Sequence, residues 1–341
     1  MKIFFIIFFI FYNGSVLAKS LFETSFYEIN FISNDVEDDK NKKITEIKFK
    51  SLNSIFDNIL IQDDFNKIKR EINEDFINFF IKNIIVDEEK IINNSYYSKI
   101  KVNFDKKKII NYLRQKELSY VEYIPDSFFT IIYEDYKINK NFLSKKNKHY
   151  KYLLENIIKY NFFALPKLDI NDRYLLSIKD IDNKNYNKIN TFINKYKYQN
   201  TVIIKSQEVN NKIKYSIFIY KDNSFHEIKN FELNNINHSL LFDELKEEII
   251  NSWKKFNYIQ NSHIHKISCT VNYFNLLELK QIKLNLNNIS IISNIDLKNI
   301  SYKSSIYDII YFGEKKILPK IFDLNGLKIN LDNETCRIYL K

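Results

Sequence analysis

The chain of 341 residues is 45% hydrophobic and carries 52 Lys and Arg against 42 Asp and Glu, a formal net charge of +10. That length and apolar content suffice for two or three domains with cores of their own. Basic and acidic residues are mixed in every segment, which favours a solvated surface over a nucleic-acid-binding face. The aromatic residues fall at core spacings and do not alternate with basic ones, which also argues against nucleic acid.

Residues 1–18 predict a secretory signal peptide. Lys2 precedes an apolar run from Ile3 to Tyr12, and a polar break and small residues follow up to Ala18. The run is shorter than a membrane-spanning helix. We therefore expect cleavage after Ala18 and export of a soluble mature protein to the periplasm. The alternative is an uncleaved amino-terminal anchor.

Residues 19–124 predict an N-terminal α+β domain. A strand after residue 20 and an acidic flexible stretch, residues 34–43, precede two amphipathic helices, residues 44–61 and 63–83. The side chains expected to face inward from these helices are Ile47, Leu52, Ile55, Phe56 and Ile59 in the first and Phe65, Ile68, Ile72, Phe76, Phe79 and Phe80 in the second. Two strands joined by a polar turn, residues 84–105, follow.

A helix from residue 106 to Leu118 is expected to close this domain, with Asp105 as its N-cap. Ile109, Ile110 and Leu113 share one side of that helix. Its first turn contains Lys106, Lys107 and Lys108, where positive charge opposes the helix dipole. These lysines indicate either an exposed corner of a scaffold or attraction to an anionic surface.

Residues 126–258 predict a middle α/β domain of alternating strands and helices. The expected strands are residues 127–136 and 162–168 and a hairpin at 200–222, and the expected helices are residues 148–161, 188–197 and 239–256. The inward side chains are expected to be Tyr150, Leu154, Ile157 and Ile158 in the first helix and Leu241, Leu245, Ile249 and Trp253 in the last. The isolated His149, His226 and His238 are expected at the surface.

Residues 262–341 predict a C-terminal domain with the order strand-helix-strand-strand-helix-strand and one added strand. This is the order of a ferredoxin-like unit. The fold class expected for the whole chain is therefore mixed, α+β and α/β, in several small modules.

Cys269 and Cys336 are the only cysteines, and export would place them in an oxidising compartment. The sequence leaves two alternatives, a disulfide or two buried apolar thiols. In a ferredoxin-like sheet the first and fourth strands are neighbours, but Cys336 belongs to the added strand.

Two further groups of residues raise alternatives with chemistry. His263, His265 and Cys269 have odd spacing and would share one face of a strand, as in a metal site, but no further ligand supports a metal. Asp169, Asp172 and Arg173 indicate either acid–base chemistry or, as we expect, a turn with a helix cap. We therefore predict no catalytic residue, no cofactor and no metal.

Scattered segments resemble a family of exported Gram-negative bacterial proteins, a domain of unknown function (DUF family 2066). They include an aromatic-rich strand with Tyr96 and Tyr97, a V-x-F-D strand end at residues 102–105 and a helix that ends in Leu113 and Arg114. Segments at residues 164–173, 250–255 and 311–331 are also similar. The middle domain is similar to the amino-terminal domain of the envelope protein TolB. The resemblance implies periplasmic export, mixed α/β modules and no assigned activity.

The function that we expect from the sequence is that of a non-enzymatic envelope protein acting through contacts with other envelope proteins. One alternative is a peripheral binder of anionic lipid or lipopolysaccharide. A second alternative is an unrecognised hydrolase built around residues 169–173.

Overall fold

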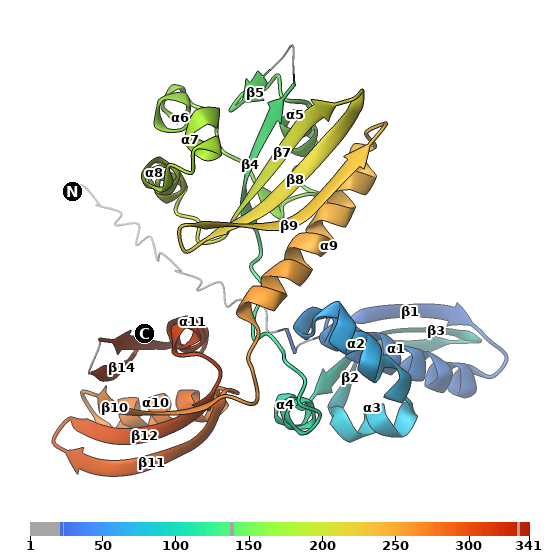
Figure 1. The fold of residues 1–341 in the computed structure, drawn as a ribbon. Helices are drawn as coiled ribbons and strands as arrows, with labels where there is room; N and C mark the ends of the chain where they lie inside the picture. The colour runs from blue at the N-terminus through green and yellow to red at the C-terminus, as the bar shows by residue number, and fades with distance from the viewer. Residues whose placement is uncertain (1–20, 23, 137–139, 333–334) are drawn as a thin grey trace, which may run out of the picture. The chain divides into compact units, whose positions relative to one another are not determined.

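The computed structural model describes residues 21–341 apart from residues 23, 137–139 and 333–334. The expected signal peptide, residues 1–18, lies outside the described residues. None of the helices in the described part is long and apolar enough to cross a membrane. The chain forms two compact units: one contains the described residues up to Phe56 together with Glu71–Leu118 and Ile259–Lys341, and the other contains Asp57–Arg70 and Ser119–Tyr258. The fold is mixed α and β, as expected (Figure 1).

The N-terminal segment contains one small antiparallel sheet with the strand order β1-β3-β2. Its elements are β1 (Tyr27–Ile32), α1 (Val36–Ile59), α2 (Gln62–Ile68), α3 (Glu74–Phe80), β2 (Ile81–Ile92), β3 (Ser95–Phe104) and α4 (Lys106–Gln115). The five side chains expected inward from the first helix are all buried in α1. The two strands and their turn are confirmed, with strictly alternating burial along β3.

Two predictions for this segment are wrong. The acidic stretch is the first part of α1, where Glu37, Asp38 and Asp39 occupy the first turn and interact favourably with the helix dipole. The single helix over residues 63–83 is interrupted between α2 and α3, because Asn73 caps a new helix by accepting a hydrogen bond from the Phe76 backbone N–H. As a consequence Phe79 is 57% exposed and not inward.

The middle segment is built on a six-stranded sheet with the order β5-β4-β7-β8-β9, in which β6 also pairs with β4. Its elements are β4 (Phe128–Asp135), β5 (Lys140–Phe142), α5 (Lys148–Glu155), β6 (Phe163–Ala164), α6 (Ile170–Leu175), α7 (Ile178–Asp182), α8 (Tyr186–Tyr196), β7 (Thr201–Val209), β8 (Lys212–Lys221), β9 (Ser224–Leu233) and α9 (His238–Asn257). Helices α6, α7 and α8 lie on one side of this sheet and α5 and α9 on the other (Figure 1).

The predicted inward face of the helix at residues 148–161 is wrong. Helix α5 ends at Glu155 and buries His149, Tyr150 and Leu153. The other expected inward residues are exposed: Leu154 by 41%, Ile157 by 53% and Ile158 by 92%. For α9 the prediction is confirmed, and Trp253 is buried.

The C-terminal segment has the expected order of elements. They are β10 (Ile264–Asn272), α10 (Leu276–Asn288), β11 (Ile292–Ser301), β12 (Ser304–Phe312), α11 (Leu318–Leu324), β13 (Leu327–Leu331) and β14 (Cys336–Leu340). The strand order is β11-β12-β10-β14-β13. The added strand β14 therefore lies between β10 and β13, in the place that a ferredoxin-like unit gives to its fourth strand, and it pairs in parallel with β10.

Helices α10 and α11 lie on the same face of this sheet (Figure 1). Side chains on that face, such as Cys269, Val271, Tyr307 and Ile309, are buried. The opposite face carries Lys266 and Ser268 of β10, which are exposed. The sheet therefore has the alternation of a strand layer that faces a core on one side only.

Candidate docking tip of the C-terminal segment

One end of the C-terminal segment presents four large apolar side chains to solvent. Exposed fractions are 81% for Phe274, 75% for Leu276, 79% for Leu277 and 88% for Tyr302. Single exposed apolar residues are common at protein surfaces, but a group of them marks an interaction site. We call these four residues the docking tip.

Two connections of the sheet bring the docking tip together. Phe274, Leu276 and Leu277 belong to the β10–α10 connection and the first turn of α10, and Tyr302 belongs to the β11–β12 turn. The Tyr273 backbone N–H donates to the Lys303 carbonyl over 3.1 Å, and the Tyr273 hydroxyl donates to the Ser301 carbonyl over 3.3 Å. These bonds hold the two connections side by side.

The start of α10 is fixed by two reciprocal side chains. Asn275 is the N-cap and accepts a hydrogen bond from the Glu278 backbone N–H over 2.9 Å. The Glu278 carboxylate accepts one from the Phe274 backbone N–H over 2.6 Å. Helix α10 buries Leu279, Ile282 and Leu286 in the core, which leaves Leu277 on its solvent side. The exposed residues at the start of α10 therefore belong to a helix terminus that hydrogen bonds hold in place.

The charged residues near the docking tip in the sequence are mostly basic. Residues 272–284 and 299–304 contain Lys280, Lys283 and Lys303 and a single carboxylate, Glu278. The Lys303 ammonium lies 5.2 Å from the centre of the Tyr302 ring. An apolar group bordered by lysines is the composition of surfaces that enter the interface of an anionic membrane.

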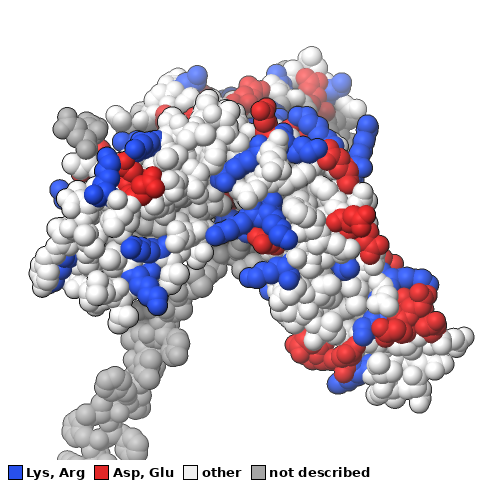
Figure 2. Space-filling model, turned by 90° about the horizontal axis from the view of Figure 1, so that it is seen from below, with Lys and Arg blue, Asp and Glu red and all other residues white. Residues whose placement is uncertain are grey.

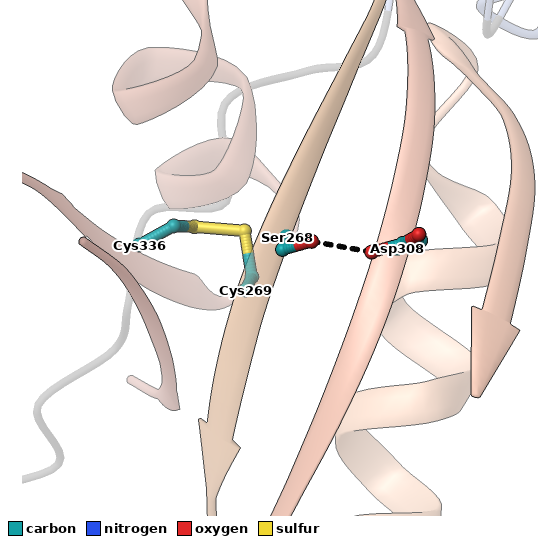
Figure 3. The surroundings of a disulfide bond; sticks show 4 residues. All are labelled: Ser268, Cys269, Asp308 and Cys336. Atoms are coloured by element: carbon teal, nitrogen blue, oxygen red, sulfur yellow. Dashed lines mark hydrogen bonds between the residues drawn. A yellow bond between two sulfur atoms is a disulfide. The ribbon is translucent and has the colours of Figure 1, made fainter. Parts of the chain in front are cut away.

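The structure joins Cys269 and Cys336 in a disulfide, with 4.5 Å between their Cα atoms. Figure 3 shows the Cys269 side chain pointing from β10 toward Cys336 on β14, while Ser268 points toward Asp308 on β12. The position of β14 next to β10 is what brings the two sulfur atoms together, because an added strand at the outer edge would not be adjacent to β10.

Asp308 holds a small ionic cluster on the face of the sheet that α10 and α11 leave open. Its carboxylate accepts hydrogen bonds from the Ser268 hydroxyl and lies 2.6 Å from the Lys266 Nζ and 3.1 Å from the Lys298 Nζ. The Lys266 and Ser268 hydrogen bonds lower the pKa of Asp308 well below its usual range. All three side chains engage the one carboxylate, and the two lysines leave the cluster with a net charge of +1.

The histidines of the metal alternative are not assembled into a ligand set. The His263 and His265 rings are 6.4 Å apart, and the Cys269 sulfur is bonded to Cys336. No cluster of three or more His, Cys, Asp or Glu that could hold a metal occurs among the described residues. A disulfide sulfur is not the thiolate that a metal site requires.

Asp169 and Asp172 form the helix cap that the sequence indicated. The Asp169 side chain accepts from the Asp172 backbone N–H over 2.9 Å, and the Asp172 carboxylate accepts from the Asp169 N–H over 3.2 Å. The Lys195 Nζ lies 2.6 Å from the buried Asp172 carboxylate. Lys195 also donates a hydrogen bond to Asp169, which lowers the pKa of the Asp169 carboxyl. Arg173 points elsewhere and donates to the Leu143 carbonyl. The arrangement accounts for both carboxylates as structural groups.

The prediction that His149 lies at the surface is wrong. Its ring is fully buried, and Nε2 lies 3.3 Å from the Tyr215 hydroxyl. The His238 ring is 5.1 Å away, and burial, with the nearby His238 and Lys148, lowers the pKa of His149 to about 3. Polar neighbours in the sequence did not reveal this, because the second helix residue after an N-cap at Asn147 faces the core.

The docking tip was not identified from the sequence, although one signal was present. The segment NLLELKQIKLNLNN contains more apolar residues than one helix face can bury. A comparison of the chain with known protein families found no matching family, and a search of curated proteins found no match either. The resemblance to the exported family therefore stays a prediction.

Proposed function

We propose that the protein is an exported, non-enzymatic protein of the cell envelope that binds an anionic membrane surface through its docking tip. The observation that carries the proposal is the exposure of Phe274, Leu276, Leu277 and Tyr302 at one end of the C-terminal segment, each by at least 75%. Transfer of such side chains out of water is favourable. Each Lys near the surface of an anionic membrane strengthens binding by about 1 kcal/mol.

The local composition, and not the net charge, supports this function. On the face drawn in Figure 2, basic and acidic side chains lie interspersed over much of the surface, so a general basic face is not the basis of the proposal. In residues 272–284 and 299–304, which contain the docking tip, Lys280, Lys283 and Lys303 by contrast outnumber the one carboxylate.

Contact with another envelope protein is the competing function. Protein interfaces are depleted of Lys relative to the rest of the surface, whereas three Lys lie close to the tip in the sequence. This composition favours a membrane as the occupant.

Flotation of the mature protein with vesicles tests the proposal. We expect binding to vesicles that contain phosphatidylglycerol and little binding to phosphatidylcholine alone, with a loss of binding as salt increases. The variant F274S/L277S/Y302S should lower the bound-to-free ratio at least about tenfold, because the apolar transfer energy is removed.

The matched control is I158S, which changes a side chain that is 92% exposed in the other compact unit. It should bind vesicles as the natural protein does. Equal binding by the tip variant, or an equal loss in I158S, would contradict the proposal. A tip that binds no vesicle but crosslinks to one envelope protein would favour the competing function.

A further inference from the structure

The lysines at the start of α4 border a pocket of about 570 Å³ within the first compact unit. Lys106, Lys107, Asn111 and Arg114 of α4 line it together with residues 286–290 and 292–295 and Phe312 of the C-terminal segment. Asp105 caps α4 by accepting hydrogen bonds from the backbone N–H groups of Lys107 and Lys108. The helix thereby buries Ile109 and Leu113 and turns Lys107, Asn111 and Arg114 away from its core side.

The charge of the pocket has one sign. Among the residues that the structure describes, two lysines and one arginine line it and no carboxylate does. Its other polar groups are the amides of Asn111, Asn287, Asn288 and Asn294 and the hydroxyls of Ser290 and Ser293. Amides and hydroxyls both donate and accept hydrogen bonds, which suits a ligand with several hydroxyl groups of its own. The volume is in the range of small-molecule sites.

Arg114 is held in place at the pocket. Its guanidinium carbon lies 4.1 Å from the centre of the Phe312 ring, and Nη2 donates to the Ser290 carbonyl. The Arg114 Nε and the Ser290 hydroxyl are both buried and have no hydrogen-bond partner within the described residues. The stacking and the hydrogen bond to Ser290 fix the guanidinium at the wall of the pocket, which Arg114 lines.

We infer that this pocket binds a sugar phosphate. A planar guanidinium held in place and two lysines match the charge of a phosphate monoester, which is about −1.5 to −2 at neutral pH. A ligand with a carboxylate in place of the phosphate would neutralise less of the pocket's positive charge. The amides and hydroxyls of the pocket match the hydroxyl groups of the sugar. The pocket is separate from the docking tip. The tip lies at the first turn of α10 and the pocket at its last turn, and a helix of 13 residues places its two ends about 18 Å apart.

Calorimetric titration of the mature protein with glucose 6-phosphate, inorganic phosphate, glucuronate and glucose tests the inference. Glucose 6-phosphate should bind more tightly than inorganic phosphate and glucuronate, and glucose should give no signal. K107Q should weaken binding of glucose 6-phosphate about tenfold, because a hydrogen bond to a charged group is lost. R114Q should weaken it further.

Lys107 is exposed, so K107Q keeps the test valid if R114Q fails to fold. K280Q, at the docking tip, is the matched control and should bind glucose 6-phosphate normally. The inference is overturned if glucose binds as tightly as glucose 6-phosphate, or if K107Q binds glucose 6-phosphate as the natural protein does. It is also overturned if glucose 6-phosphate at about 10 mM does not bind at all. K107Q should still bind vesicles, so failure of this inference and failure of the membrane proposal are distinguishable.

Discussion

The six-stranded sheet of the middle segment and the five-stranded sheet of the C-terminal segment differ in how many faces are covered. In the middle sheet, β4 is buried along nearly its whole length: Phe129, Ile131 and Tyr133 join a core with α8 and β7, and Phe128 contacts Phe162 on the other side. In the C-terminal sheet, β12 buries Tyr307 and Ile309 under the helices, and its other face is open. When both faces of a sheet are covered, its polar groups must find hydrogen-bond partners inside the protein.

The buried polar residues follow this difference. In the middle segment the Glu134 carboxylate, 1% exposed, accepts from the Lys148 backbone N–H and from Asn141, both over 2.8 Å. His149 is neutral because it is buried there. In the C-terminal segment Asp308 stays ionised, since lysines from the two neighbouring strands reach it over the open face. Between pH 7 and 4.5 the stability of the middle sheet should therefore change through His149. The C-terminal sheet, whose Asp308 stays ionised over that range, should depend on its crosslink.

Removal of the disulfide should have the largest effect. The bond closes a loop with a sequence separation of 67 residues, and loss of such a crosslink lowers the free energy of unfolding by about 4 kcal/mol. We expect C269A/C336A to lose that protection at the amides of β10 and β14, measured by hydrogen exchange, while β4 and β7 keep theirs.

A reducing agent should give the natural protein the same exchange pattern and should leave the double variant unchanged. Unaltered protection of β10 and β14 in the variant would show that the C-terminal sheet does not depend on the crosslink.

Acid should weaken the middle segment through His149. Its pKa is about 3 in the folded protein and ordinarily about 6.5 in an unfolded chain, so the unfolded state binds more protons below pH 6.5. Stability contributed by the neutral ring is complete above pH 6.5 and is lost as the pH falls toward 3. At pH 4.5 the loss is about 3 kcal/mol.

Urea unfolding followed by the fluorescence of Trp253, the one tryptophan, measures this effect inside the same compact unit. H149Q should remove most of the change between pH 7 and 4.5, and H226Q should retain it. His238, whose pKa burial also lowers, lies beside the same ring and sets the remainder. Lys148 is the other charged group near the ring. A pH profile that H149Q does not alter would contradict the assignment.

Much of the C-terminal and N-terminal architecture could be predicted from the sequence, because one-sided elements show a clear period. Alternation in β3 and the 3.6-residue stripe of α1 identify their buried faces directly. The Asp105 cap was predictable for the same reason, as a polar residue directly before an amphipathic run. The disulfide could be stated only as an alternative, since it depends on where β14 enters the sheet.

The remainder depends on information that no local pattern contains. In α5 the apolar residues beyond Glu155 suggest a longer helix, yet the chain turns there and Ile158 is left exposed. His149 is buried because a helix and two aromatic rings cover it from distant parts of the chain. The docking tip and the basic pocket were missed because exposure, unlike helix period, is set by neighbours far away in sequence.

The smallest effect on stability should come from the docking tip, and it separates residues that hold the fold from residues that are available for binding. Phe274, Leu277 and Tyr302 are each at least 79% exposed, so replacing them with serine changes little of the area that is buried on folding. We expect F274S/L277S/Y302S to change the free energy of unfolding by less than about 0.5 kcal/mol, measured by urea unfolding at neutral pH. L279A, which truncates the adjacent inward residue of α10, should lose about 2–5 kcal/mol in the same assay. A large loss in the tip variant would mean that these side chains pack within the segment, and its weaker vesicle binding could then not be assigned to the tip.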